Sequence, residues 1–307
     1  MNKEFSDKKY LITVTGPTGV GKTATTIQLA KHFSADLFSA DSRQLYKEMS
    51  IGTAKPTAQE LSEATHHFID HVSVTEHYNA GMYEREFNAK ISDYFTRKNI
   101  AILTGGTGMY IRAAIEGLDQ FPDIPKEIRN KYEDIFKQGG LKTLQKLIVD
   151  LDPEYAAVVD INNARRLTRA LEVIETSKQT FTSFLNQKKK RKSAYSTLKI
   201  CLIRDRSELY DRINRRVDQM MDQGQLEEVK RLLPYKNLKS MQTVGYSELF
   251  RHLDGELTLD DAVELVKRNS RRYAKRQMTW FRNQGQWKMI HAEDYDELLR
   301  YITQEVS

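Results

Sequence analysis

Residues 16–23, with the sequence GPTGVGKT, match the phosphate-binding pattern G-x-x-x-x-G-K-[ST]. An apolar, β-branched run at 10–15 precedes them and a helical pattern at 22–33 follows, which is the strand–loop–helix context that such a loop requires. Glycines permit the backbone angles at which successive N–H groups converge on a phosphate, and the helix adds the positive end of its dipole. We therefore predict a phosphate site in which Lys22 contacts the terminal oxygens and the Thr23 hydroxyl ligates Mg²⁺.

Asp41 is a candidate for moving a proton, because it closely follows a strand-like run at 35–39. In a parallel sheet the carboxyl ends of the strands share one edge, so Asp41 is expected beside the phosphate loop. A carboxylate at that place acts as a general base if it reaches a proton on the acceptor. Position alone supports a second interpretation equally well, in which Asp41 and Ser42 cap the segment that follows.

A further strand-like run, at 99–104, leads into the glycine-rich segment 105–110, GGTGMY. An ordinary P-loop ATPase carries an aspartate at the end of this strand, where it helps to hold Mg²⁺, so its absence argues against an ATP hydrolase. A glycine pair lets a ligand approach the backbone, and Thr107 is placed to hydrogen-bond a phosphate. A tight strand-to-helix turn is compatible with the same residues.

Arg212 and Arg216 lie four residues apart in a helical pattern at 208–223. They flank an apolar stripe on one face, so both guanidinium groups can converge on one anion. The alternative is a pair of surface arginines bonded to Asp211 or Asp218. The stripe that we expect to be buried consists of Leu209, Ile213, Val217 and Met220.

A one-sided charge pattern marks the helical stretch at 257–284. Between Lys267 and Arg282 there are seven basic residues and no acidic one, with aromatic residues among them. A helix of one charge sign repels itself, so we favour an RNA-binding surface over a merely solvated helix face.

The alternation of strand-like and helical segments predicts an α/β fold, with a P-loop NTPase-like parallel sheet as its core. The expected strands are at 10–15, 35–39, 100–104 and 198–203, and the expected helices between them are at 22–33, 80–98 and 108–116.

Helical patterns without strand-like runs predict an inserted, mainly helical domain before the last of these strands. These patterns cover 125–138, 140–150, 153–159 and 163–177. We therefore assign residues 1–119 and 196–307 to the catalytic core and residues 120–195 to the insertion. The insertion ends near the basic run Lys188–Lys192, which we interpret as a solvated loop.

The bulk composition fits a soluble, cytoplasmic protein. The 307 residues carry 48 Lys and Arg against 42 Asp and Glu, and this net charge of +6 permits a polyanionic partner without requiring one. Cys201 is the only cysteine, which excludes an internal disulfide and a thiolate zinc site. The sequence shows neither a signal peptide nor a membrane-spanning run, so we expect no membrane partner. We also expect a monomer.

Seven segments together resemble the tRNA dimethylallyltransferase family, whose members are also called tRNA isopentenyltransferases. They occur in the family's order over nearly the whole chain. They are 16–23, 41–46 (DSRQLY), 51–56 (IGTAKP), 105–110, 165–172 (RRLTRALE), 244–246 (VGY) and 274–280 (AKRQMTW). Ser247 stands where many members carry a basic residue. The carboxyl-terminal zinc finger of eukaryotic members is absent, so the similarity is to the bacterial type.

This resemblance implies transfer of the dimethylallyl group from dimethylallyl diphosphate to N6 of the adenosine immediately 3′ of the anticodon, position 37 of the tRNA. Diphosphate is released, Mg²⁺ is the implied cofactor, and the anticodon stem-loop of tRNA is the implied partner. The implied catalytic residues are Asp41, Thr107 and Arg212. The implied diphosphate-binding residues are Gly16, Pro17, Thr18, Gly19, Val20, Gly21, Lys22, Thr23 and Arg216. The implied tRNA-binding residues are Asp41, Ser42, Arg43, Gln44, Thr107, Arg129, Arg165, Arg166, Leu167, Thr168, Arg169, Gln242, Gly245, Tyr246, Arg271, Arg272, Lys275 and Arg276.

Two other functions use some of the same residues. A P-loop kinase acting on a small molecule or a nucleoside would use the phosphate loop for ATP and Asp41 to activate a hydroxyl. That alternative leaves the basic stretch at 267–282 and the insertion unexplained. A non-catalytic RNA-binding protein leaves Lys22 and Asp41 without a role.

Overall fold

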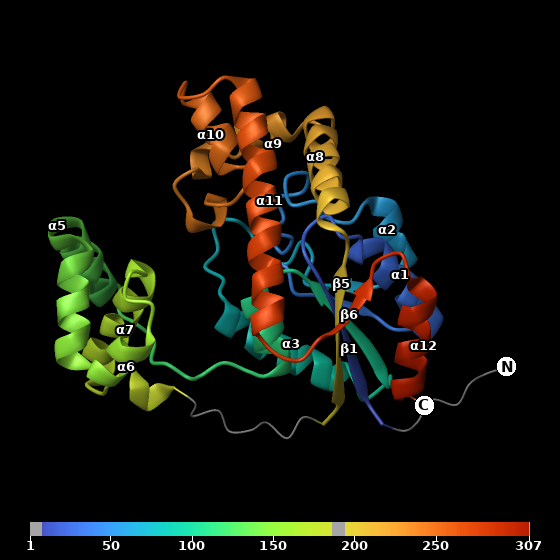
Figure 1. Cartoon of the computed structure of the whole chain (residues 1–307), viewed down its shortest axis with the longest axis horizontal. Helices are drawn as coiled ribbons and strands as arrows, with labels where there is room; N and C mark the ends of the chain where they lie inside the picture. Colours follow the sequence, from blue (N-terminus) through green and yellow to red (C-terminus); the bar gives the residue numbers. More distant parts are fainter. Residues whose placement is uncertain (1–7, 186–193, 307) are drawn as a thin grey trace. The chain divides into compact units, whose positions relative to one another are not determined.

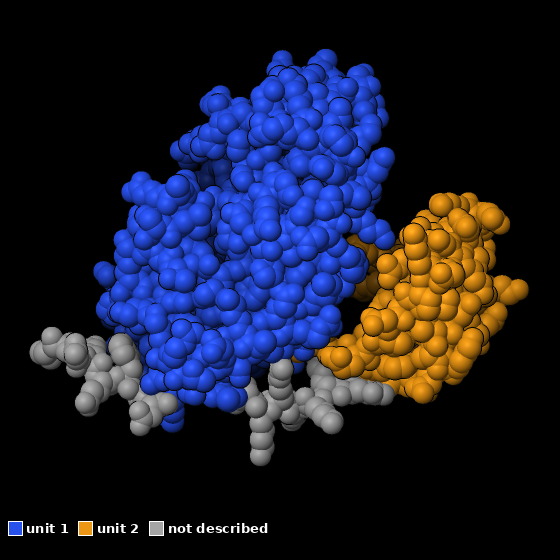
Figure 2. Space-filling model, turned by 180° about the vertical axis from the view of Figure 1, so that it is seen from behind, with its two compact units in different colours: residues 1–116, 193–307 blue, residues 117–192 orange. Residues whose placement is uncertain are grey.

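The computed structural model describes residues 8–185 and 194–306 of the chain. These residues form two compact units, one made of residues 8–116 and 194–306 and the other of residues 117–185, which Figure 2 draws in different colours. The domain limits expected from the sequence, 119/120 and 195/196, are close to these divisions and stay a prediction. The basic run Lys188–Lys192 lies outside the described residues.

The first unit is built on a parallel sheet, whose described strands lie in the order β3-β2-β4-β1-β5-β6 (Figure 1). The strands are β1 (Tyr10–Thr15), β2 (Leu37–Ser39), β3 (His66–His67), β4 (Ile100–Gly105), β5 (Ser196–Ile203) and β6 (Lys288–His291). Thr15, the last residue of β1, pairs with Gly105 of β4 and with Cys201 of β5. Because the strands are parallel, the loops that follow them meet at one edge, which we call the carboxyl edge. The predicted α/β fold is confirmed.

Helices cover both faces of this sheet, which explains why β1 is an uninterrupted buried run. The helices that cover it are α1 (Lys22–Phe33), α3 (Ala80–Tyr94), α4 (Gly108–Ile115) and α12 (Tyr295–Val306). On one face Val14 shares a buried core with Ile27 of α1 and Ile302 of α12. On the other face Phe38 of β2 packs edge-on against Phe87 of α3, with ring centroids 5.8 Å apart.

Further helices of the first unit follow β2 and β5 along the chain. They are α2 (Ala58–Glu63), α8 (Arg206–Asp222), α9 (Gln225–Arg231), α10 (Ser247–Leu253), α11 (Leu259–Asn283) and the short 3₁₀ turns η2 (Leu233–Tyr235) and η3 (Lys239–Met241). Polar contacts join α8 to α11: Arg271 Nη1 donates to Asn214 Oδ1 at 2.5 Å, and Lys267 pairs with Asp218 at 2.8 Å. No helix in the described ranges combines the length and apolar character needed to cross a membrane.

The predicted core elements are confirmed with shifts at their ends. The strand at 10–15 and the helix at 22–33 agree with the structure residue for residue, whereas the helix predicted at 80–98 ends at Tyr94. The apolar stripe of α8 is buried only as far as Val217, and Met220 is half-buried. Strands β3 and β6 were missed because they are short. They lie at the two edges of the sheet, where β3 pairs with β2 and β6 pairs with β5.

The second unit is a small helical bundle with its own core. Its elements are α5 (Lys126–Leu151), α6 (Pro153–Val158), α7 (Ala164–Ser177) and the 3₁₀ turn η1 (Thr182–Phe184). Gly140 has a positive φ of 64° and breaks α5, in agreement with the two helices predicted at 125–138 and 140–150. Buried Asp152 caps α6 by accepting from the Tyr155 N–H at 3.0 Å, and it also accepts from the backbone and hydroxyl of Thr182 at 2.8 Å each.

Candidate active site

The phosphate loop, which we define as residues 16–23, joins β1 to α1 at the carboxyl edge. Its backbone lies against the neighbouring strand, so that a Cβ added at Gly16 would be 2.7 Å from the carbonyl oxygen of Leu202. The ammonium group of Lys22 folds back over the loop and donates to the carbonyl oxygens of Gly16, at 3.0 Å, and Pro17, at 2.9 Å. The strand–loop–helix context predicted for a phosphate site is therefore present.

Lys22 is electrostatically tuned for an anion. Burial is the largest influence on this ammonium and lowers its pKa to about 8. The carboxylate of Asp41 opposes that shift, and the guanidinium of Arg216 adds to it. A phosphate bound in the loop would supply a further negative charge, so binding an anion stabilises the charged form of Lys22.

Three arginines surround the phosphate loop. Arg204, directly after β5, donates from Nε to the Val20 carbonyl oxygen at 2.8 Å. From α8, Arg212 donates from Nε to the Gly19 carbonyl oxygen at 2.9 Å. Arg216, one turn further along, donates to the carbonyl oxygen of Ala54 at 3.4 Å, and burial lowers its pKa. Of the predicted pair, Arg212 therefore contacts the phosphate loop directly, and Arg216 contacts the segment that contains Ala54.

The structure does not support the surface-pair alternative: among the described residues neither arginine pairs with Asp211 or Asp218, and Asp218 pairs with Lys267 of α11 at 2.8 Å. Arg204 was missed by the sequence analysis. It also pairs with Glu208 and with Glu293, the latter at 2.8 Å, and it is nearly buried. The signal that could have found it is its place: a basic residue one position beyond a core strand, at the edge where the phosphate loop lies.

Asp41 has the capping role that its position allowed, and its role as a base stays a prediction. Its Oδ1 accepts from the backbone N–H groups of Arg43, at 2.8 Å, and Gln44, at 3.3 Å, so one oxygen stabilises the turn that follows β2. Among the described residues its Oδ2 receives no side-chain or backbone hydrogen bond, which leaves that oxygen for a ligand. The negative charge of Asp41 acts on Lys22, as well as on Tyr273.

Thr107 lies beside Asp41, where the backbone N–H and the hydroxyl of Ser42 hold its side chain. Its Oγ1 accepts from the backbone N–H of Ser42 at 3.0 Å and donates to the Ser42 hydroxyl at 3.3 Å. Tyr273, on α11, lies near Thr107, whose hydroxyl is one influence on the pKa of the tyrosine. Burial, followed by the charge of Asp41, raises the pKa of Tyr273 to about 12, so this hydroxyl stays protonated at neutral pH. The sequence analysis gave Tyr273 no place in the site.

The glycine turn, which we define as residues 105–108, packs closely against other parts of the protein. A Cβ added at Gly105 would lie 2.5 Å from the backbone of Ala40, and one added at Gly108 would lie 2.5 Å from the Trp280 ring. The space that the sequence suggested for a ligand at Gly105 is therefore filled by the chain itself. Glycine is needed here so that the end of β2 and the helix α11 can approach.

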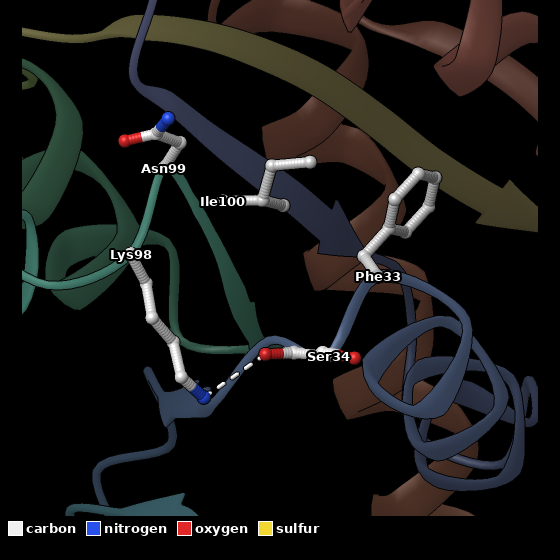
Figure 3. Close-up of a pocket in the computed structure, with 5 residues that line it drawn as sticks. All are labelled: Phe33, Ser34, Lys98, Asn99 and Ile100. Carbon is white, nitrogen blue, oxygen red and sulfur yellow. Dashed lines mark hydrogen bonds between the residues drawn. The ribbon is translucent and has the colours of Figure 1, made fainter. Parts of the chain in front are cut away.

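A hollow at the opposite edge of the sheet has a different character (Figure 3). It lies between the end of α1 and the start of β4 and is lined by Phe33, Ser34, Lys98, Asn99 and Ile100. Its lysine, Lys98, is already engaged: it donates to the Ser34 carbonyl oxygen at 2.9 Å and pairs with Asp36 at 2.8 Å. This hollow holds no free cation for an anion, so the carboxyl edge is the candidate active site.

Comparisons with known proteins agree with this assignment. A family model described as IPP transferase matches residues 44–284. The chain belongs to the IPP transferase family. The tRNA dimethylallyltransferase of Christiangramia forsetii is 44% identical over 300 residues, covering 97% of this chain and 99% of the relative. The tRNA dimethylallyltransferase 1 of Bacteroides thetaiotaomicron is 44% identical over 292 residues, covering 95% of this chain and 94% of the relative.

Solved structures of IPP transferases have the same fold. The full-length tRNA isopentenylpyrophosphate transferase from Bacillus halodurans matches with a TM-score of 0.72 and 35% identity, and the match covers 97% of each chain. A eukaryotic dimethylallyltransferase, studied as it acts on tRNA, matches with a TM-score of 0.78 and 29% identity over 97% of this chain and 77% of that one. The chain is therefore a prenyl-transferring enzyme, and the kinase alternative is not supported.

Two residues expected to contact tRNA from the family motif are structural in this IPP transferase. Tyr246 is 0% exposed, and its hydroxyl donates to Oε1 of buried Glu228 at 2.6 Å. Gly245 uses its N–H to donate to Glu248 at 2.8 Å, and its carbonyl oxygen accepts from Gln225 at 3.1 Å. Neither residue presents a free group to an RNA, so the role transferred from the motif is corrected to one of packing.

Glu228, which the sequence analysis missed, fixes the loop at 50–56. Its carboxylate accepts from the N–H groups of Ser50, Ile51 and Gly52 at 2.9, 2.8 and 3.0 Å, in addition to the Tyr246 hydroxyl. The same loop carries Ala54, whose carbonyl oxygen accepts from Arg216 and from Gln44 Nε2. A buried carboxylate thus anchors the segment that borders the arginine cluster. No short motif predicts this contact.

The remaining residues expected at the RNA side divide into engaged and exposed groups. Arg43 Nη1 donates to the Ser240 carbonyl oxygen at 2.9 Å, and Arg271 is bonded to Asn214. Lys267 is paired with Asp218 and Glu264. The exposed residues are Gln242, Arg272, Lys275 and Arg276.

In the second unit, α7 carries five of the residues that the resemblance assigns to tRNA. Arg165 and Arg166 are exposed, and Arg169 lies 3.6 Å from the carboxylate of Glu172. Leu167 is 0% exposed and belongs to the core of the unit, so its side chain is unavailable to tRNA. Arg129 and Thr168 are half-exposed.

Proposed function

We propose that this chain transfers the dimethylallyl group of dimethylallyl diphosphate to N6 of the adenosine immediately 3′ of the anticodon, position 37 of the tRNA. The observation that carries the proposal is the convergence at the carboxyl edge of a phosphate loop with surrounding cations and a carboxylate. Lys22 and Arg212 donate to carbonyl oxygens of the loop, and the charge of Asp41 acts on Lys22. The phosphate loop and its cations suit the leaving group, and the carboxylate of Asp41 suits the acceptor.

Departure of diphosphate builds negative charge on its oxygens. Lys22 would follow that charge as a point cation, because its present partners are two uncharged carbonyl oxygens. Arg212 and Arg216 carry further donors beside the loop. Preorganised cations at a developing anion lower the barrier without reorganising during the reaction.

The acceptor is a weak nucleophile, since the lone pair of an exocyclic amine is delocalised into the purine ring. Asp41 Oδ2 would take a proton from that amine as it attacks the allylic carbon, while Oδ1 keeps the turn in place. Thr107, fixed by Ser42, would hydrogen-bond a reacting partner beside it. The target base must leave its stack to reach these groups.

Mg²⁺ is the proposed cofactor, and the donors present suit it. The Thr23 hydroxyl at the start of α1 and the Asp41 carboxylate are oxygen donors of the kind that Mg²⁺ prefers, and diphosphate oxygens and water would complete its shell. When bound, the ion would neutralise charge on the leaving diphosphate. This chain's residues would hold the ion through few contacts, because β4 ends in Gly105 where an ordinary P-loop ATPase has an aspartate that helps to hold Mg²⁺.

We propose that tRNA contacts Arg272, Lys275 and Arg276 on α11 and the exposed arginines of α7, Arg165 and Arg166. All five are exposed, and the buried side of α11 contacts the glycine turn. Backbone phosphates are the natural partners of such arginines and lysines. A monomer acting in the cytoplasm stays our prediction, which gel filtration and cell fractionation would check.

The test is incubation of the protein with Mg²⁺, dimethylallyl diphosphate or ATP, and unmodified tRNA, followed by mass analysis of the nucleosides. We expect one dimethylallyl unit on adenosine with the allyl donor and no product with ATP. A tRNA with guanosine at position 37 is the matched control and should stay unmodified. Phosphate transfer from ATP, or modification of the control tRNA, would contradict the proposal.

A further inference from the structure

Gln277, on the buried side of α11, bridges the two glycine-rich loops of the site. Its Oε1 accepts from the backbone N–H of Thr18, in the phosphate loop, at 2.9 Å. Its Nε2 donates to the carbonyl oxygen of Gly106, in the glycine turn, at 2.8 Å. An N–H needs an acceptor and a carbonyl needs a donor, so these two partners define which end of the amide is oxygen. Gln277 is 7% exposed, which leaves water little access to the bridge.

The glycine turn is shaped to admit this amide. A Cβ added at Gly106 would lie 2.3 Å from the Nε2 atom of Gln277, so any larger residue would displace the side chain. The Thr18 N–H, although it belongs to the phosphate loop, is used by the protein and not by a ligand. The helix α11 therefore holds one end of the loop whose other end carries Lys22.

Neighbouring residues of the same helix reinforce the contact. The ring of Trp280, one turn after Gln277, lies where a Cβ of Gly108 would be. Tyr273, one turn before Gln277, lies near Thr107. The exposed side of α11 carries the basic residues Arg272, Lys275 and Arg276. The helix α11, drawn as one long ribbon in Figure 1, thus touches both glycine-rich loops through buried side chains and also carries exposed cations.

We propose that Gln277 is a positioning residue that links RNA binding on the outer side of α11 to diphosphate binding in the phosphate loop. The inference rests on the proposed function for the identity of the two ligands. RNA bound to Arg272, Lys275 and Arg276 restrains the helix, and the helix restrains the loop through the Gln277 amide. Because coupling between two binding sites is reciprocal, diphosphate must strengthen RNA binding by the same factor.

Loss of the amide has a definite cost. Gln277→Met has nearly the same shape but neither donates nor accepts, so the Thr18 N–H and the Gly106 carbonyl lose their partner in a buried place. From the cost of leaving such groups unpaired, we expect diphosphate to bind roughly 10- to 100-fold more weakly. The cations on the exposed side are untouched, so RNA binding without diphosphate should not change.

The experiment is calorimetric titration of the full-length protein with inorganic pyrophosphate in Mg²⁺, with and without an unmodified anticodon stem-loop RNA. In the wild-type protein, RNA should lower the Kd for pyrophosphate. In Gln277→Met the Kd should rise as stated and the effect of RNA should fall to a factor of about one. Gln286→Met, the same change at an exposed glutamine beyond α11, is the matched control and should behave as wild type. An unchanged pyrophosphate affinity and an unchanged RNA effect in Gln277→Met would overturn the inference.

Steady-state kinetics and a second variant separate positioning from loss of folding. The KM for the allyl donor should rise in Gln277→Met while the Kd for tRNA measured without donor stays constant, which general unfolding would not produce. Gln277→Glu keeps the acceptor for Thr18 but loses the donor to Gly106 and adds a negative charge, so it should also weaken pyrophosphate binding. Wild-type affinity in Gln277→Glu would contradict the proposal even if Gln277→Met fails to fold. A wild-type protein that modifies no tRNA would instead refute the proposed function.

Discussion

The two glycine-rich loops at the carboxyl edge differ in the charge around their backbone. In the phosphate loop the carbonyl oxygens accept from the loop's own Lys22 and from Arg204 and Arg212, which surround the backbone with positive charge. In the glycine turn the nearest groups are the backbone of Ala40 and side chains of α11. Glycines pack closely in both loops, since a Cβ added at Gly16 would lie 2.7 Å from the carbonyl oxygen of Leu202 and one added at Gly105 would lie 2.5 Å from Ala40. A glycine motif alone does not show which loop is surrounded by cations.

The largest effect is expected at Asp41, which stands between the two loops. Asp41→Asn keeps an oxygen for the N–H groups of Arg43 and Gln44 but removes the base, so transfer should fall roughly 10³-fold. Single-turnover assays with saturating tRNA would measure the rate, and filter binding would show unchanged affinity for tRNA. Full activity in this variant would remove Asp41 from the base role.

The next largest effect is expected in the phosphate loop itself. Lys22→Ala removes the cation that faces the leaving group, and kcat/KM for the allyl donor should fall by about 10²-fold. Affinity for tRNA and the melting temperature should change little, since Lys22 is bonded only to carbonyl oxygens of its own loop. Unaltered donor kinetics would mean that the diphosphate binds elsewhere.

The glycine turn should respond in stability and not in ligand contact. Gly108→Ala places a Cβ against the Trp280 ring, and we expect a loss of roughly 1–3 kcal/mol in the free energy of unfolding. Urea denaturation of this variant, of Trp280→Leu and of the double variant would form a mutant cycle. The double variant should lose less than the sum of the single changes, because the shorter side chain relieves the overlap. Strict additivity would show that the two residues do not compete for space.

The pH dependence of pyrophosphate binding tests the role of Lys22 in the phosphate loop. Burial lowers the pKa of Lys22 to about 8 in the free protein, and a bound anion favours the protonated form and so raises that pKa. Pyrophosphate affinity should therefore fall as the pH rises above about 8, by up to roughly tenfold per unit. Lys22→Arg does not titrate in this range and serves as the reference for the titration of pyrophosphate itself. Identical profiles for both proteins would exclude Lys22 as the titrating group.

The smallest effect is expected on the RNA side of α11. Replacement of Arg272, Lys275 and Arg276 by glutamine should lower the slope of log Kd for tRNA against log salt by roughly two, because three phosphate contacts are lost. Lys267→Gln is the control, since this lysine is already paired with Asp218 and Glu264. A slope unchanged by the triple replacement would place the RNA on another surface.

Local patterns predicted most of the fold, including the strand, loop and helix around the phosphate loop. The run of buried β-branched residues at 10–15, the glycines that follow it and the helix from Lys22 are neighbours in the chain, so their spacing alone predicts strand, loop and helix. Asp41 was predicted for the same reason, as a carboxylate just beyond the end of a parallel strand.

The remaining parts of the site depend on contacts between distant segments. Gln277 meets Thr18 and Gly106, and Glu228 meets the loop at 50–52, only after the sheet and α11 have formed. Family motifs gave Tyr246 and Leu167 a role at the RNA, but both are fully buried. Recurrence in a motif does not distinguish a residue that packs from one that touches a ligand.

The account is tested most directly by a crystal structure of the protein with pyrophosphate, Mg²⁺ and an anticodon stem-loop that contains the target adenosine. We predict pyrophosphate oxygens within hydrogen-bond distance of Lys22 Nζ, and the adenine N6 within the same reach of Asp41 Oδ2. Pyrophosphate outside the phosphate loop, or an adenine amine remote from Asp41, would contradict the account.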